Sequence, residues 1–184
     1  MGKILMNRKK LVTEMGRIDA ETFREAGKLP LVVVLDNVRS LHNVGSVFRT
    51  ADAFRVERIL LCGITATPPS AEIHKTALGA EDVVEWLYFE STMDAVAALR
   101  SEGFNVFSIE LCEGSIALQD FATVEGERYA VVLGNEVKGV QQAVVDASDG
   151  AIEIPQFGTK HSLNVSVTAG MVIWEFAKKL GMVE

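Results

Sequence analysis

Short runs of apolar residues alternate along this chain with longer segments in which apolar residues recur every three or four positions. The short runs are rich in β-branched residues, which is typical of strands buried on both faces of a parallel sheet. They predict strands at 31–36, 55–63, 104–111, 129–134 and 150–154, with a further short strand at 83–86. The longer segments predict helices at 44–54, 91–102, 137–147 and 164–180. Strands that alternate with helices predict an α/β fold with a mainly parallel sheet flanked by helices.

The domain organisation follows from the length and from breaks in this pattern. A chain of 184 residues suits one domain with a sizeable core. Residues 1–27 are polar and charged, and we expect them to form a basic N-terminal helical arm on a single main domain at 28–184. Residues 64–75 contain Pro68 and Pro69 and form the longest irregular stretch. We expect them to be an exposed loop that could cover a substrate.

The charges give a divided indication about nucleic acid. There are 25 acidic and 18 basic residues, and the formal net charge of −7 by itself argues against a nucleic-acid partner. Five basic residues nevertheless lie within the first seventeen positions: Lys3, Arg8, Lys9, Lys10 and Arg17. This group could contact phosphate, or it could be the solvated face of a helix.

The cysteines and histidines do not have the spacing of a metal site. Cys62 and Cys112 show no CxxC pattern, and the three histidines are scattered. Both cysteines end apolar runs, which favours buried structural thiols in a reducing compartment. No apolar run reaches the roughly 18 residues that span a membrane, and the N-terminus lacks the apolar segment of a signal peptide. We therefore expect a cytoplasmic protein without a bound metal.

Three polar segments that contain glycine follow predicted strands. Asn43 and Arg49 lie in HNVGSVFR, and Glu136 lies in GNEVKG. The third segment runs from Pro155 to Asn164 and leads into the last helix. Ligands of parallel sheets gather at the carboxyl ends of the strands, so we expect the three segments to converge there.

Purely structural interpretations of these residues stay open. Asn164 could cap the last helix and do nothing more, and Glu136 could cap the helix that follows it. Arg49 could form a surface ion pair with Asp52. Familiar nucleotide and nucleophile motifs are missing from the sequence: GxGxxG and GxSxG do not occur, and the GNEVKG segment lacks the Lys and Ser or Thr of a phosphate loop. The remaining Arg, Glu, Asn and Ser side chains suit holding polar and phosphate groups rather than forming a covalent intermediate.

Taken together, the three segments resemble the SpoU family, also called TrmH, of RNA ribose 2′-O-methyltransferases in the SPOUT superfamily. LDNVRSLHNVGSVFRTADAF is similar to the first family motif, VVLGNEVKGV to the second and IPQFGTKHSLNVSVTAGMVIWEF to the third. The resemblance covers about residues 31–180. It implies a deep C-terminal trefoil knot, S-adenosylmethionine as methyl donor, and an obligate homodimer with active sites at the subunit interface. Such a knot would be an exception to the rule that chains do not thread their own loops.

The resemblance also implies the site residues. The catalytic residues would be Asn43 and Arg49 of the first motif, Glu136 of the second, and Ser162 and Asn164 of the third. The cofactor would be held largely by backbone groups at Leu133, Gly134, Ile154, Pro155, Ser162 and Leu163. Glycine suits such positions because the backbone must approach the ligand closely. Every catalytic position of the motifs is kept, but the N-terminal arm is short where ribosomal-RNA members carry a separate RNA-binding domain.

The reaction implied by the resemblance is methyl transfer from S-adenosylmethionine to a ribose 2′-hydroxyl of RNA. Because arginine almost never loses its proton, we expect Arg49 to hold a phosphate and to stabilise the developing oxyanion rather than to act as the base. Asn43, Glu136 and Asn164 would then orient Arg49 and the ribose. Transfer RNA is preferred over ribosomal RNA as the substrate, because the compact architecture and the GTKHSLNVSV segment look more like tRNA-modifying members.

Two alternative functions remain at this stage. A non-catalytic RNA-binding or assembly factor on the same fold would be expected to lose Arg49 or Asn164, and both are present. A small-molecule enzyme on an ordinary doubly wound fold predicts a glycine-rich fingerprint, which is missing. If the partner is RNA, positive charge should be concentrated around Arg39, Arg49, Lys138, Lys160 and the arm, and affinity should fall with salt.

Overall fold

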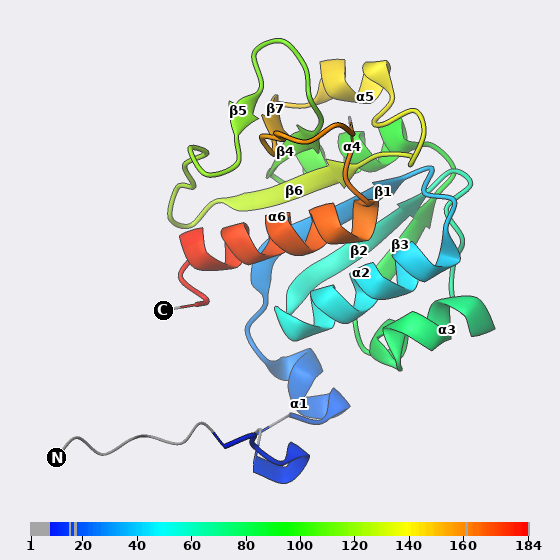
Figure 1. Cartoon of the computed structure of the whole chain (residues 1–184), viewed down its shortest axis with the longest axis vertical. Coiled ribbons are helices and arrows are strands. Elements are labelled where there is room, and N and C mark those ends of the chain that lie inside the picture. Colours follow the sequence, from blue (N-terminus) through cyan, green and yellow to red (C-terminus); the bar gives the residue numbers. More distant parts are fainter. Residues whose placement is uncertain (1–7, 15, 17, 161, 184) are drawn as a thin grey trace, which may run out of the picture.

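A seven-stranded sheet forms the centre of the molecule, with helices on both of its faces (Figure 1). The computed structural model describes residues 8–14, 16, 18–160 and 162–183. The strands lie in the order β3-β2-β1-β6-β4-β7-β5, and all neighbouring pairs are parallel. Their bounds are β1 Leu29–Asp36, β2 Val56–Cys62, β3 Trp86–Phe89, β4 Phe104–Ile109, β5 Ile116–Ala117, β6 Arg128–Leu133 and β7 Gly150–Glu153. The predicted α/β fold with a parallel sheet is confirmed.

Two layers of helices cover the sheet. On one face lie α2 and α6, with α1 and α3 at the edge of this layer, and on the other face lie α4 and α5. The bounds are α1 Ala20–Glu25, α2 Leu41–Ala53, α3 Ala71–Ala77, α4 Thr92–Ser101, α5 Gln142–Ala147 and α6 Val165–Lys179. Short 3-10 turns occupy Val12–Glu14 and Ala80–Asp82.

The run of apolar residues in β1 shows why this strand is central. Successive side chains of a strand point to opposite faces, so Leu31, Val33 and Leu35 join the core beneath α2 and α6. Val32 and Val34 instead join the core beneath α4 and α5. All five are completely buried, and each such burial contributes roughly 1.5–3 kcal/mol. A strand apolar on only one face would leave polar groups against the second layer of helices.

The topology determines where a ligand can bind. From β1 the chain proceeds through α2 to β2 on one side, whereas β6 lies on the other side of β1. In parallel sheets this change of direction opens a crevice at the carboxyl ends of the strands. The three polar segments predicted to converge leave the carboxyl ends of β1, β6 and β7, which lie at this side of the sheet.

The N-terminal arm is less helical than predicted. In the part of residues 1–27 that is described, only the 3-10 turn and the six-residue helix α1 are regular. Asp19 caps α1 through a hydrogen bond from the Thr22 amide to its Oδ1, at 2.8 Å. Lys3 and Arg17 of the predicted basic group lie outside the described residues.

Three further predictions about local structure were wrong. The expected loop at 64–75 ends in α3, because Ser70 caps a helix that starts at Ala71. The helix predicted at 137–147 begins only at Gln142, because residues 135–139 form a tight turn. The short strand expected at 83–86 lies at Trp86–Phe89 instead.

Two predictions concern the chain as a whole: a trefoil knot and the absence of a membrane-spanning segment. The trefoil knot stays a prediction. Among the helices that the structure describes, none is long and apolar enough to cross a membrane.

Candidate active site

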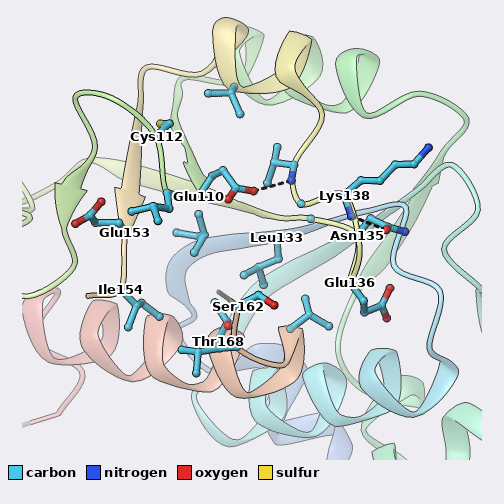
Figure 2. Close-up of a pocket in the computed structure, with 18 of the residues that line it drawn as sticks. Glu110, Cys112, Leu133, Asn135, Glu136, Lys138, Glu153, Ile154, Ser162 and Thr168 are labelled. Carbon is cyan, nitrogen blue, oxygen red and sulfur yellow. Dashed lines mark hydrogen bonds between the residues drawn. The ribbon is translucent and has the colours of Figure 1, made fainter. Parts of the chain in front are cut away.

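A cavity of about 470 Å³ lies at the carboxyl ends of β4, β6 and β7, against the start of α6 (Figure 2). Five of the six predicted cofactor-binding residues line it: Leu133, Gly134, Ile154, Ser162 and Leu163. The sixth, Pro155, lies between two lining residues but is not one itself. The walls of the cavity combine apolar side chains from the strand ends with backbone from two loops. The structure therefore brings the second and third polar segments together, as expected.

The loop after β6 lines one side of this cavity, and two glycines make its shape possible. Asn135 and Gly139 exchange two backbone hydrogen bonds of 3.0 and 2.9 Å, so the chain doubles back within five residues. A Cβ at Gly134 would lie 2.1 Å from the carbonyl carbon of Gly139, which no side chain tolerates. Gly139 itself has φ +68°, a conformation that glycine adopts without strain.

Two carboxylates hold the exit from this loop. The amide of Val140 donates to Oε2 of Glu110 at 2.9 Å, and the amide of Gln141 donates to Oδ2 of Asp36 at 3.0 Å. Asp36 is completely buried and also accepts from Asn37, Thr92 and the Gln141 side chain. Glu110 and Asp36 were not among the site residues predicted from the motifs. Both lie at the carboxyl end of a predicted strand, so the criterion that selected the other residues could have found them.

Beside the cavity, a polar network joins all three segments. Nδ2 of Asn43 donates to Oε1 of Glu136 at 3.2 Å, and Oδ1 of Asn43 accepts from Nδ2 of Asn164 at 3.1 Å. Ser166 adds a longer bond of 3.4 Å to the same oxygen of Asn43. The side-chain amide of Asn43 is thus fixed in orientation, because Glu136 accepts from its nitrogen while Asn164 and Ser166 donate to its oxygen.

Glu136 is held by backbone as well as by Asn43. Its two oxygens accept from the amides of Arg39 and Ser40, both at 3.0 Å, directly before α2. Glu136 therefore binds the start of α2, not the following helix as the structural alternative proposed. Partial burial by itself would raise the pKa of Glu136, but these backbone hydrogen bonds and the one from Asn43 lower it below the ordinary value. Glu136 is a carboxylate at neutral pH.

Asn164 caps α6, as its structural interpretation required. Its Oδ1 accepts from the amides of Ser166 and Val167 at 2.9 and 3.3 Å. Because its Nδ2 also donates to Asn43, the cap and the polar network share one side chain. Ser162 lies two residues earlier and lines the cavity (Figure 2).

Arg49 lies apart from this network within the chain. It follows Asn43 by six residues on α2, which places it about 9 Å further along the helix and about 120° around it. Its side chain is exposed, and no hydrogen bond or ion pair connects it to another residue of the described chain, Asp52 included. The expectation that Asn43, Glu136 and Asn164 orient Arg49 is thus not met within one subunit.

The structure is that of a parallel α/β protein with a cavity at the carboxyl ends of β4, β6 and β7 and a polar network beside it. The model of the SpoU rRNA Methylase family matches residues 30–174. The chain belongs to this family, and the resemblance inferred from the three motifs is confirmed.

Relatives of this chain include named RNA methyltransferases. An uncharacterized tRNA/rRNA methyltransferase of Borreliella burgdorferi is 28% identical over 88% of this chain and 69% of its own length. The 23S rRNA (guanosine-2′-O-)-methyltransferase RlmB of Neisseria meningitidis is 31% identical over 79% of this chain and 57% of its own length. Among solved structures, the AdoMet-bound rRNA methyltransferase of Sinorhizobium meliloti superposes with a TM-score of 0.76 at 26% identity, covering 84% of this chain and 61% of its own. The chain thus spans between 57% and 69% of the length of these relatives.

Proposed function

We propose that this protein transfers a methyl group from S-adenosylmethionine to the 2′-hydroxyl of a ribose in RNA. The observation that carries the proposal is the network of Asn43, Glu136 and Asn164 at the edge of a cavity lined by the expected cofactor residues. Family membership supports the reaction class, since relatives include a 2′-O-methyltransferase and an AdoMet-bound enzyme.

The residues of the cavity fit this cofactor. Its volume of about 470 Å³ falls in the range of small-molecule sites, roughly 300–1,000 Å³. Leu133, Ile154 and Leu163 offer apolar contact for a flat base, and the loops bring backbone donors and acceptors to the same space. S-adenosylmethionine supplies a methyl group on a positively charged sulfonium sulfur. The carboxylates of Glu110 and Glu136 line the cavity and complement that charge.

The side chains divide the work of positioning the ribose and handling its proton. Asn43 is pre-oriented by Glu136 and Asn164, so it can present a fixed hydrogen-bonding group to the ribose without first becoming ordered. Arg49 holds an RNA phosphate through its planar guanidinium and stabilises the oxyanion that develops on the 2′-oxygen. The proton leaves to phosphate or water, because arginine stays protonated.

A homodimer completes the site in this proposal. On α6, Val167, Met171 and Trp174 form a stripe that is 53%, 45% and 46% exposed. These positions follow one another by four and three residues, so they share one face of the helix. A continuous apolar face of this kind marks an interaction surface. We propose that a second subunit covers it, and that Arg49 of each subunit acts at its partner's site.

Transfer RNA is the substrate in this proposal. Its phosphates would contact Arg39, Lys138 and Lys160, which are exposed like Arg49. The GTKHSLNVSV sequence of the third motif supports tRNA, whereas the names of the relatives include both tRNA and rRNA. The alternative function, that of a non-catalytic RNA-binding factor, would involve RNA binding without methyl transfer.

Methyl transfer to two RNA pools tests the reaction and the substrate together. Labelled S-adenosylmethionine is incubated with bulk tRNA or ribosomal RNA and either the wild-type protein or Arg49→Lys. Label should enter tRNA, and Arg49→Lys should lower the rate at least about tenfold, since lysine keeps the charge but not the planar fork. Near-normal turnover by Arg49→Lys would overturn the phosphate and oxyanion role. Absence of label despite cofactor binding would favour the non-catalytic factor.

A mixed dimer tests the placement of Arg49. Arg49→Ala and Asn164→Ala subunits, each inactive as a homodimer, are combined by unfolding and refolding together. If Arg49 acts at the partner's site, one site of each heterodimer has both residues intact, and activity returns. If Arg49 acts within its own subunit, both sites of every heterodimer lack one residue, and the mixture stays inactive.

A further inference from the structure

Glu110 lines the cavity, and the proposed function uses only its negative charge, not its capacity to accept hydrogen bonds from a ligand. It follows β4 directly, and its backbone amide donates to the carbonyl of Ile152 in β7 at 3.1 Å. Figure 2 shows its side chain over the middle of the cavity, next to Leu133. This is the side of the sheet at which nucleotide-binding folds place an acidic residue for ribose hydroxyls.

The hydrogen bonds of Glu110 leave room for a ligand. Oε2 accepts from the amide of Val140 at 2.9 Å, and Oε1 accepts from the amide of Leu111 at 3.0 Å. Each oxygen of a carboxylate can accept two hydrogen bonds, so one position on each oxygen stays open. No lysine or arginine of the described chain forms an ion pair with Glu110. Its negative charge is therefore available to hydroxyl donors.

A role as a loop anchor explains only part of this arrangement. The contact with Val140 and the close approach to Gly139, where a Cβ would lie 2.2 Å from Oε2, hold the loop after β6. The backbone uses one acceptor position on each oxygen, through the amides of Val140 and Leu111. The second position on each oxygen and the negative charge are not needed to hold the loop.

The other two acidic residues of the cavity are less suited to a pair of hydroxyls. Oε1 of Glu136 already accepts two hydrogen bonds and Oε2 accepts one, so only one acceptor position stays open. Glu153 accepts from Ser115 at 2.6 Å, and its side chain points away from the middle of the cavity toward the rim.

We propose that Oε1 and Oε2 of Glu110 accept hydrogen bonds from the 2′- and 3′-hydroxyls of the cofactor ribose, and that Glu110 thereby selects ribose over deoxyribose. This inference rests on the proposed function, because it requires an S-adenosyl ligand in the cavity. It goes further in naming the side chain that reads the sugar. Glu110 is then a specificity residue that also holds the loop.

Calorimetric titration with S-adenosylhomocysteine and with its 2′-deoxy and 3′-deoxy analogues tests this directly. For the wild-type protein, loss of either hydroxyl should weaken binding about 10- to 100-fold, as expected of a hydrogen bond to a charged group. Glu110→Gln should bind S-adenosylhomocysteine about as weakly as the wild type binds the deoxy analogues. For Glu110→Gln, removal of either hydroxyl from the ligand should weaken binding further by less than about threefold, because the carboxylate that accepts from that hydroxyl is already absent.

Glu153→Gln is the matched control, since it removes one charge from the same cavity. It should discriminate between ribose and deoxyribose as the wild type does. Glu110→Asp keeps the charge but withdraws the oxygens by one methylene, so it should discriminate less than the wild type, and it replaces Glu110→Gln if that variant does not fold.

The outcomes separate this inference from the function beneath it. If the wild type and Glu110→Gln both bind S-adenosylhomocysteine and lose the same affinity when a hydroxyl is removed, the role of Glu110 is overturned and the proposed function stays intact. A wild-type protein that binds the deoxy analogues as tightly as S-adenosylhomocysteine would do the same. A wild-type protein that binds none of the three would overturn the proposed cofactor, and the role of Glu110 with it.

Discussion

Replacement of Asn43 by aspartate tests the polar network with almost no change in shape. In Asn43→Asp, an oxygen takes the place of Nδ2, which lies 3.2 Å from Oε1 of Glu136. The bonds from Asn164 and Ser166 to the other oxygen are kept. The change therefore converts one hydrogen bond into a contact between two carboxylates and leaves the rest of the network in place.

The size of the effect follows from this distance. Two unit charges about 3.2 Å apart repel by about 1 kcal/mol at the dielectric constant of water and by about 5 kcal/mol at an effective value of about 20. Because Glu136 is exposed, the lower end of this range applies, and the lost hydrogen bond adds about 1 kcal/mol. We expect the free energy of unfolding to fall by about 2 kcal/mol near pH 8, which lowers Tm by about 4–8 °C. Methyl transfer should fall as well, since the ribose-positioning amide is lost.

The pH dependence distinguishes repulsion from simple loss of a bond. Repulsion raises the folded-state pKa of the carboxylate pair, so the destabilisation is present above that pKa and disappears as the pH falls through it. In the wild type the opposite holds: the lowered pKa of Glu136 contributes stability above its unfolded-state pKa, which is lost on acidification. Asn43→Ala, which adds no charge, should show a deficit that changes less between about pH 4 and 8. If Asn43→Asp loses no more stability near pH 8 than near pH 4, the contact with Glu136 does not exist as described.

Further variants and reagents test the surroundings of the site. Gly134→Ala is expected to lower the free energy of unfolding by about 1–3 kcal/mol and to weaken S-adenosylhomocysteine binding, because the added Cβ would lie 2.1 Å from Gly139; unchanged denaturant unfolding and binding would refute this. Asp36→Asn should lower the free energy of unfolding, measured in urea, by about 3 kcal/mol, because at least one of the four donors around this buried carboxylate would meet an NH₂ group. A decrease below about 1 kcal/mol would argue against this. Burial raises the pKa of Cys62 to about 12, so a thiol reagent should label the half-buried Cys112 in the native protein and Cys62 only after unfolding; rapid native labelling of both would contradict the buried position of Cys62.

The strands could be predicted from the sequence because this sheet is buried on both faces. Runs such as 31–35 and 129–133 are apolar throughout and buried, as is typical of parallel strands covered by helices on both faces. The helix α3 was missed because Pro68 and Pro69 suggested a loop, although Ser70 after them is an N-cap residue. Helical spacing after Glu136 hid the turn that Gly139 closes, because periodicity does not reveal a backbone hydrogen bond between Asn135 and Gly139.

The site was predictable in its members but not in its connections. The motifs identified Asn43, Glu136 and Asn164, and the structure brings them into one network. Nothing in the spacing indicated that Glu136 would bind the start of α2, because that contact joins residues 96 and 97 positions apart. Nor could the spacing place Arg49, because its direction depends on which faces of α2 the sheet, α3 and α6 cover.

The chemical position of the transferred methyl group tests the central claim most directly. A methyl group on a ribose 2′-oxygen removes the nucleophile that alkali needs to cleave the adjacent phosphodiester. RNA labelled by the wild-type protein with methyl-labelled S-adenosylmethionine should therefore yield its label in alkali-resistant dinucleotides, and RNA treated with Arg49→Ala should carry almost none. Label recovered in mononucleotides as a methylated base would contradict the account.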